Sequence, residues 1–250
     1  MINTKKNGNK KPKFLVVIRH GERIDFSAEQ NDQKLDPNDP ELTEEGKAQA
    51  QKIGQIINTY FIKKTPNEFK SCLILTSPFS RTIMTSVNIA NRLKDSKINV
   101  KIMLENRLSE FIKDDAFDKE CSKFLSVYNY KENEDLKQFM FKFIGEEYLN
   151  ELNTESLEGL PQFNETRQNV YNRLKVLFKN NISNFEEFDY IFCVSHGTPI
   201  AEFYRFLRND KEDIRDSSIK YCDAYVFEYF KTLTKSEVEY VEKLTVNSEF

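Results

Sequence analysis

The stretch "FLVVIRHGERID", residues 14–25, begins as an apolar run and turns polar within two residues. Its first five residues are bulky and apolar, as in a strand that is buried on both faces of a sheet. The stretch "YIFCVSHGTP", residues 190–199, is built in the same way, with an apolar run, one polar residue and then His-Gly. The protein has only two histidines, His20 and His196, and each of them follows such a run.

Further runs along the chain indicate the fold class. Apolar, β-branched runs recur at 72–77, 98–104 and 224–229. Polar stretches with helical spacing separate the runs, and they predict one helix over 43–62, with Thr43 as its N-cap, and another over 78–93. Strands that alternate with helices are typical of a mostly parallel sheet with helices on both faces. We therefore expect an α/β protein with three layers, α/β/α.

Composition and charge argue against several kinds of partner. A net charge of -3 and a pI near 5.7 provide no basic field for nucleic acid, so we expect no nucleic-acid partner. The N-terminus has no apolar region like that of a signal peptide, and no apolar run is long enough to span a bilayer, so we expect a cytoplasmic or nuclear protein with no membrane partner. The four cysteines include no C-x-x-C pair, and no carboxylate cluster suits magnesium. We therefore expect no metal and no cofactor.

The chain is expected to form one domain, because no internal repeat or second core-sized pattern is visible. Residues 1–13 predict a flexible basic tail, and residues 14–250 predict a single domain. Within that domain, residues 111–165 are rich in Lys and Glu and contain aromatic patches, which predicts a mainly helical insertion beside the sheet. The oligomeric state stays open, with a homodimer as one alternative.

The two His-Gly segments predict a binding site at one edge of the sheet. Ligands of open α/β sheets collect at the carboxyl ends of the strands, where neighbouring strands would bring His20 and His196 together. Arg19 and Arg23 flank the first histidine, and Arg81 follows the run at 72–77. Guanidinium groups pair bidentately with phosphate oxygens, so this set favours a phosphate-like dianion. Taken singly, each histidine could instead be a hydrogen-bonded core residue, and each arginine a surface ion pair.

Four motifs in this order resemble the histidine phosphatase (phosphoglycerate mutase-like) superfamily. They are "RHG" at 19–21, "LTEEGKAQA" at 42–50, "TSPFSRTIMTS" at 76–86 and "SHGTP" at 195–199. The longer form "RHGERID" is most similar to the branch that contains the T-cell receptor signalling suppressor phosphatases and the ecdysteroid-phosphate phosphatase. The resemblance covers about residues 14–230 and implies a phosphoglycerate mutase-like fold.

The resemblance also implies roles for the candidate residues. His20 would be the nucleophile that accepts the phosphoryl group, and Glu110, in "LENRLSEF", would be the acid that protonates the leaving oxygen, with Glu105 as the alternative. The phosphoryl group would be held by Arg19, Arg23, Arg81 and His196. An imidazole is largely neutral at cytosolic pH and can attack phosphorus, so cationic side chains can stabilise the phosphoryl oxygens without a metal.

The leading hypothesis is a metal-independent phosphomonoesterase that works through a phosphohistidine. Its substrate would be phosphotyrosine or another bulky phosphate ester, on a small molecule or on a phosphoprotein. One alternative is a phosphoglycerate mutase-type phosphotransferase; Arg23 and Asp25 stand where that class has the small-residue loop "RHG-x-S-x-x-N". The other alternative is a catalytically silent phosphate-binding scaffold, which would be expected to lack a histidine or Arg19.

Overall fold

The computed structural model describes residues 13–26, 39–65, 69–112, 164–185, 187–188, 190–231 and 236–249. The predicted basic tail (1–13) lies outside these residues except for Lys13, with which the first strand begins. The predicted helical insertion (111–165) lies outside them except for its two ends.

The described residues form a six-stranded sheet with the order β3-β2-β4-β1-β5-β6. The four strands from β3 to β1 pair in parallel, whereas β5 and β6 add to the β1 edge in antiparallel fashion, so the expected mostly parallel sheet is found. The last strand was not predicted from the sequence. The bounds are β1 (Lys13–Arg19), β2 (Ser71–Thr76), β3 (Asn99–Leu104), β4 (Tyr190–Ser195), β5 (Ala224–Lys231) and β6 (Ser236–Leu244).

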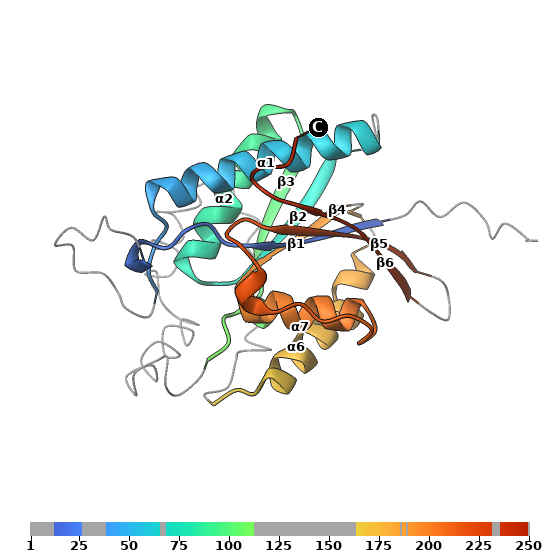
Figure 1. Ribbon diagram of the computed structural model, residues 1–250. Helices are drawn as coiled ribbons and strands as arrows, with labels where there is room; N and C mark the ends of the chain where they lie inside the picture. Colours follow the sequence, from blue (N-terminus) through green and yellow to red (C-terminus); the bar gives the residue numbers. More distant parts are fainter. Residues whose placement is uncertain are drawn as a thin grey trace, which may run out of the picture.

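Helices cover both faces of the sheet, with α1 and α2 on one face and α6 and α7 on the other (Figure 1). The predicted three-layer α/β/α architecture is therefore confirmed. Among the described helices, none combines the length and the apolar character that a membrane span requires. The helix bounds are α1 (Glu44–Lys64), α2 (Ser80–Asp95), α6 (Arg167–Asn180) and α7 (Gly197–Leu207), with 3-10 turns η1 (Ile24–Phe26), η2 (Asn106–Leu108), η3 (Ile182–Asn184) and η4 (Asp216–Ser218).

The starts of α1 and α2 have different caps. Thr43 is the N-cap of α1, as predicted, and its Oγ accepts from the Gly46 amide at 2.8 Å. The helix predicted over 78–93 begins two residues later, at Ser80, because the preceding residue is extended. The Asp39 carboxylate supplies the missing cap by accepting from the Ser80 amide at 2.9 Å. A residue from before α1 therefore fixes the first turn of α2.

The strand order places the site. β1 lies between β4 and β5, and its residue Arg19 pairs with Ser195 of β4. A histidine directly follows each of these two residues, so the two imidazoles lie next to each other beyond the ends of the strands. β2 borders β4 on its other side, and the Ser77 amide donates to the Val194 carbonyl at 3.0 Å. Three chain segments that are remote in the sequence thus meet at one carboxyl edge.

Candidate active site

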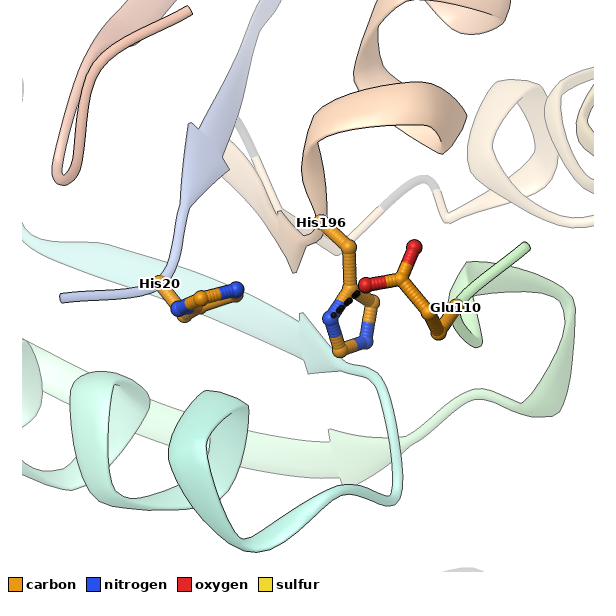
Figure 2. A group of neighbouring side chains, drawn as sticks. All are labelled: His20, Glu110 and His196. Atoms are coloured by element: carbon orange, nitrogen blue, oxygen red, sulfur yellow. Dashed lines mark ion pairs between the residues drawn. The ribbon is translucent and has the colours of Figure 1, made fainter. Parts of the chain in front are cut away.

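The two histidines lie together, as the spacing predicted. Their ring centroids are 5.3 Å apart, and His20 and His196 are 1% and 0% exposed. Figure 2 shows His20 leaving the end of β1 and His196 standing at the start of α7, with the Glu110 carboxylate on the far side of the second ring. Three candidate catalytic side chains therefore form one cluster.

His20 is oriented by the main chain. Its Nδ1 lies 2.7 Å from the carbonyl oxygen of Gly21, which can only accept, so Nδ1 carries the proton and donates. In the neutral ring Nε2 then keeps its lone pair. Burial lowers the pKa of His20 well below its usual value, and the charges of three neighbours lower it further: Arg81, His196 and Arg19. The imidazole is thus held neutral and can act as a nucleophile.

His196 has a polar side chain near each ring nitrogen. Its Nε2 lies 2.9 Å from the Ser77 hydroxyl, and its Nδ1 lies 3.3 Å from Oε2 of Glu110. Burial lowers the pKa of His196 to about 4 and outweighs the attraction of the Glu110 carboxylate. A neutral ring with its proton on Nδ1 lets the Ser77 hydroxyl donate to Nε2. The Nδ1–H is then directed at an anion.

Glu110 follows η2 and is 18% exposed, more than the histidines beside it. Burial raises the pKa of its carboxyl, but His196, Arg81 and the Phe111 amide favour the charged form and hold the pKa below its usual value. The contacts are 3.5 Å from Oε2 to the Arg81 guanidinium and 2.9 Å from the Phe111 amide to Oε1. Glu110 is therefore an ionised carboxylate that faces two of the candidate phosphate ligands.

Glu105, the alternative acid, lies elsewhere. Its two carboxylate oxygens accept from the Arg107 guanidinium at 2.7 and 3.0 Å, and its side chain also caps η2 through the Arg107 amide. Glu105 is 8% exposed. Of the two glutamates left open by the sequence, the structure therefore brings Glu110, and not Glu105, to the histidines.

Arg81 enters the cluster from the first turn of α2 and is 1% exposed. Its guanidinium stacks over the Phe79 ring, with 4.5 Å from Cζ to the ring centroid. It also makes long ion pairs with Asp39 at 3.4 Å and Glu110 at 3.5 Å. These pairs are longer than usual charge-assisted hydrogen bonds, so a closer anion can compete for the guanidinium.

Arg19 and Arg23 differ in how they meet the cluster. The Arg19 guanidinium lies over the Tyr221 ring, with Cζ 4.6 Å from the centroid, and donates to the Ile219 carbonyl. Its charge contributes to the lowered pKa of His20. Arg23 instead forms a two-bonded pair with Asp25, at 3.0 and 2.5 Å, and its charge contributes to the lowered pKa of His196. The structure brings Arg19 and Arg81 to His20 more directly than Arg23.

Two side chains of the cluster were not predicted. Ser77 holds His196, and the Tyr221 ring lies 5.8 Å from the His20 ring. Ser77 carried a usable signal, because it is the polar residue that ends an apolar run, in a place like those of Arg19 and Ser195 before the two histidines. Tyr221 carried none, since it reaches the site from a turn before β5.

The cluster also offers donor atoms for a metal ion. One ligand atom each from His20, Glu110 and His196 lies within 4.8 Å of the other two. However, the Arg81 guanidinium lies 3.5 Å from the same carboxylate, and its charge disfavours a cation there. The residues fit a tetrahedral anion better than a metal ion.

Comparison with protein families supports the resemblance seen in the motifs. Residues 15–116 match the model of the histidine phosphatase superfamily (branch 1). The matched part includes His20, Arg81 and Glu110, whereas His196 lies beyond it. The resemblance is therefore confirmed over the segment that carries most of the candidate site.

Several solved structures are similar in fold. The mycobacterial glucosyl-3-phosphoglycerate phosphatase in complex with inorganic phosphate gives a TM-score of 0.53 at 16% identity, covering 95% of this chain and 100% of that chain. The ecdysone phosphate phosphatase from Bombyx mori in complex with tungstate gives a TM-score of 0.54 at 17% identity, covering 92% of both chains. No curated protein matches the sequence. The chain thus has the fold of these solved phosphatases, and over residues 15–116 it carries the sequence pattern of the histidine phosphatase superfamily, branch 1.

Proposed function

We propose that the protein is a metal-independent phosphomonoesterase that works through a phosphohistidine at His20. The observation that carries the proposal is a buried, neutral His20 whose Nδ1–H donates to Gly21, which leaves the Nε2 lone pair available beside two arginines. The family match and the phosphatases among the similar structures support phosphatase activity.

In the first step Nε2 of His20 attacks the phosphorus, and the bond from phosphorus to the ester oxygen breaks. The electron pair of that bond leaves on the ester oxygen, which takes a proton from the Glu110 carboxyl to become an alcohol. The guanidinium groups of Arg81 and Arg19 and the Nδ1–H of His196 donate hydrogen bonds to the phosphoryl oxygens and stabilise their negative charge. Arg23 adds a longer-range positive charge in this scheme.

Glu110 needs a proton before it can act as the acid. A bound phosphate competes with its carboxylate for the Arg81 guanidinium, which lies only 3.5 Å away. The added negative charge then raises the pKa of Glu110. A phosphate ester has its second pKa near 6, so a substrate bound as the monoanion can bring the proton with it. Substrate binding and protonation of Glu110 are therefore coupled.

In the second step a water oxygen attacks the phosphorus of phosphohistidine, and the phosphorus–nitrogen bond breaks. The electron pair returns to Nε2 of His20, and the Glu110 carboxylate takes one proton from the water. Glu110 then passes this proton to the departing phosphate or to solvent, so that Glu110 is again an ionised carboxylate and His20 a neutral imidazole. Glu110 thus serves as acid and then as base.

The proposed substrate is phosphotyrosine or another bulky phosphate ester, on a small molecule or a phosphoprotein. Its support is the Tyr221 ring beside His20, which offers an aromatic surface to a planar leaving group. A phosphopeptide and an alkyl phosphate compared by kcat/KM would test this choice.

The central experiment varies the leaving group in Glu110→Gln. p-Nitrophenolate leaves without a proton, whereas an alkoxide needs one, so we expect kcat/KM for an alkyl phosphate to fall by roughly 10² to 10⁴ and that for p-nitrophenyl phosphate to fall far less. Glu45→Gln on the exposed first turn of α1 is the control and should leave both rates unchanged. Equal losses on both substrates would remove the acid role of Glu110.

Three further outcomes separate the alternatives. Loss of activity with a chelator would indicate a metal-dependent phosphatase. Transfer of phosphate to an added alcohol or phosphoglycerate, with little release of inorganic phosphate, would indicate a phosphotransferase. Phosphate binding without turnover of any ester would indicate a silent binding scaffold.

A further inference from the structure

The loop that carries Glu110, residues 107–110, is hydrogen-bonded through its backbone to one side chain of α6. Three backbone carbonyl oxygens of this loop accept from the guanidinium of Arg173: those of Arg107, Ser109 (2.9 Å) and Glu110 (3.2 Å). Arg173 is 8% exposed. One planar group thus spans the residues that lead directly into the candidate acid.

The Arg173 guanidinium is itself held in place. The Glu165 carboxylate accepts from its Nε at 2.7 Å and from its Nη2 at 3.1 Å. Glu165 is 6% exposed, and its amide donates to the Ile112 carbonyl at 3.1 Å. A buried two-bonded pair fixes the plane of the guanidinium, which fixes the direction of its remaining N–H groups. The loop carbonyls therefore face a rigid set of donors.

The loop depends on these donors for its conformation. Buried carbonyl groups need partners, and after η2 the chain no longer supplies them from its own helical bonds. The Leu108 carbonyl takes its partner from β4, where the Ser195 hydroxyl donates at 2.6 Å. The loop is thus held between α6 and β4, and Glu110 projects from its end towards His196 and Arg81.

We propose that Arg173 is a positioning residue for the acid–base step, and that it acts by fixing the backbone from which Glu110 projects. This inference rests on the proposed function of Glu110. Arg173 bonds to the backbone of Glu110 and not to its carboxylate, so it holds the acid without touching the reacting atoms. A displacement of a catalytic group by about 1 Å can lower the rate roughly 10²-fold. The rate should therefore depend on how firmly the backbone of Glu110 is fixed.

The test is Arg173→Lys, which keeps the charge but loses the fork of donors. We expect kcat/KM for an alkyl phosphate to fall roughly 10- to 100-fold and that for p-nitrophenyl phosphate to fall only a few fold. The inhibition constant of inorganic phosphate should stay within about twofold of the wild-type value, because the phosphate-binding arginines are untouched. A fold defect alone would lower both rates together.

Arg107→Lys is the matched control. Arg107 is also buried, at 6% exposed, and also forms a two-bonded pair with a glutamate, but its guanidinium bonds to Glu105 and Asn181. The Arg107→Lys variant should have a lower melting temperature, but its ratio of kcat/KM for the alkyl phosphate to that for p-nitrophenyl phosphate should not change. An equal change of the ratio in both variants would overturn the proposal, because any loosening of the loop would then suffice.

Two further variants keep the test decisive. Glu165→Gln leaves Arg173 in place but loosens it, and should shift the ratio in the same direction by less; it carries the test if Arg173→Lys does not fold. In Glu110→Gln, adding Arg173→Lys should not change the ratio again. If Glu110→Gln is selective and neither Arg173→Lys nor Glu165→Gln is, the proposal on Arg173 fails alone. If Glu110→Gln is not selective, the acid role fails first.

Discussion

The ends of β1 and β4 share one sequence pattern but hold their histidines differently. His20 is bound by the main chain at Nδ1, through the Gly21 carbonyl. His196 has a side chain at each nitrogen, Ser77 at Nε2 and Glu110 at Nδ1. One ring therefore keeps a nitrogen lone pair for bond formation, whereas the other has a nitrogen that faces a carboxylate and can donate to an anion. The contrast shows that one local motif can place a histidine in two different surroundings, which are set by the neighbouring residues.

The largest effect should separate the roles proposed for the two histidines. His20→Ala removes the proposed nucleophile, so we expect kcat to fall by about 10⁴ or more. His196→Ala removes one donor to the phosphoryl group, with an expected loss of roughly 10² to 10³. Quenching without acid, followed by mass spectrometry, should find phosphate on His20 of the wild type. Phosphate on His196 would reverse the assignment, and phosphate on serine or cysteine would end it.

Arginine variants should show the same asymmetry at a smaller scale. Arg81 is buried beside His20 and His196, so Arg81→Ala should cost kcat/KM roughly 2 to 4 kcal/mol, as for other preorganised anion donors. Arg23 is paired with Asp25, so Arg23→Ala should cost about 1 kcal/mol or less. Steady-state kinetics on p-nitrophenyl phosphate measures both. A loss in Arg23→Ala as large as in Arg81→Ala would place both arginines equally at the phosphate.

A pH titration sharpens the comparison, because all histidine signals of the protein come from this site. Burial lowers the pKa of both rings, so nitrogen NMR should find neither ring protonated near pH 6.5, and His196 should titrate at about pH 4. His20→Asn assigns the signals.

The unfolded chain takes up these protons near pH 6.5, so the unfolding free energy should fall below that pH, by up to about 1.4 kcal/mol per pH unit per histidine. A midpoint near 6.5 in the folded protein would contradict the burial.

A small effect should also come from Ser77→Ala. The variant removes the contact at Nε2 of His196, worth about 0.5 to 1.5 kcal/mol, and leaves His20 untouched. We expect a loss in kcat of roughly two- to tenfold, together with unchanged trapping of phosphate on His20. Reduced trapping in single-turnover experiments would show that Ser77 also affects the nucleophile.

Much of the fold followed from the apolar runs, and the exception has a physical cause. β6 reads "SEVEYVEKL", with charged residues between the apolar ones, as suits an edge strand with a solvated face. A search for continuous apolar runs finds strands buried on both faces and misses such a strand. The helix caps were also partly hidden, since Asp39 caps α2 from 41 residues away.

In the site, residues at strand ends were predictable and residues that reach it from elsewhere were not. His20, His196 and Arg81 each come within a few residues of the end of an apolar run, and the topology brings them together. Arg173 lies in a polar helix and looks like a surface charge in the sequence, yet it is buried against Glu165. Arg23 lies three residues after His20 in the sequence, but the Asp25 carboxylate binds its guanidinium. The sequence pattern therefore predicts which residues lie at the ends of strands, but it does not predict which side chains pair with one another.

The backbone contact between Gly21 and α1 has a consequence for how mutations at this site would be read. A Cβ on Gly21 would lie 2.4 Å from the Gly46 carbonyl oxygen, and a Cβ on Gly46 would lie 2.3 Å from the Glu22 carbonyl oxygen. Both opposing atoms are main chain and cannot turn aside. In a screen of all substitutions, these two glycines should therefore be as intolerant as His20, but through lost yield of folded protein instead of lost turnover. A genetic assay that scores growth alone would merge the two classes, whereas measuring abundance beside activity would separate the two glycines from His20.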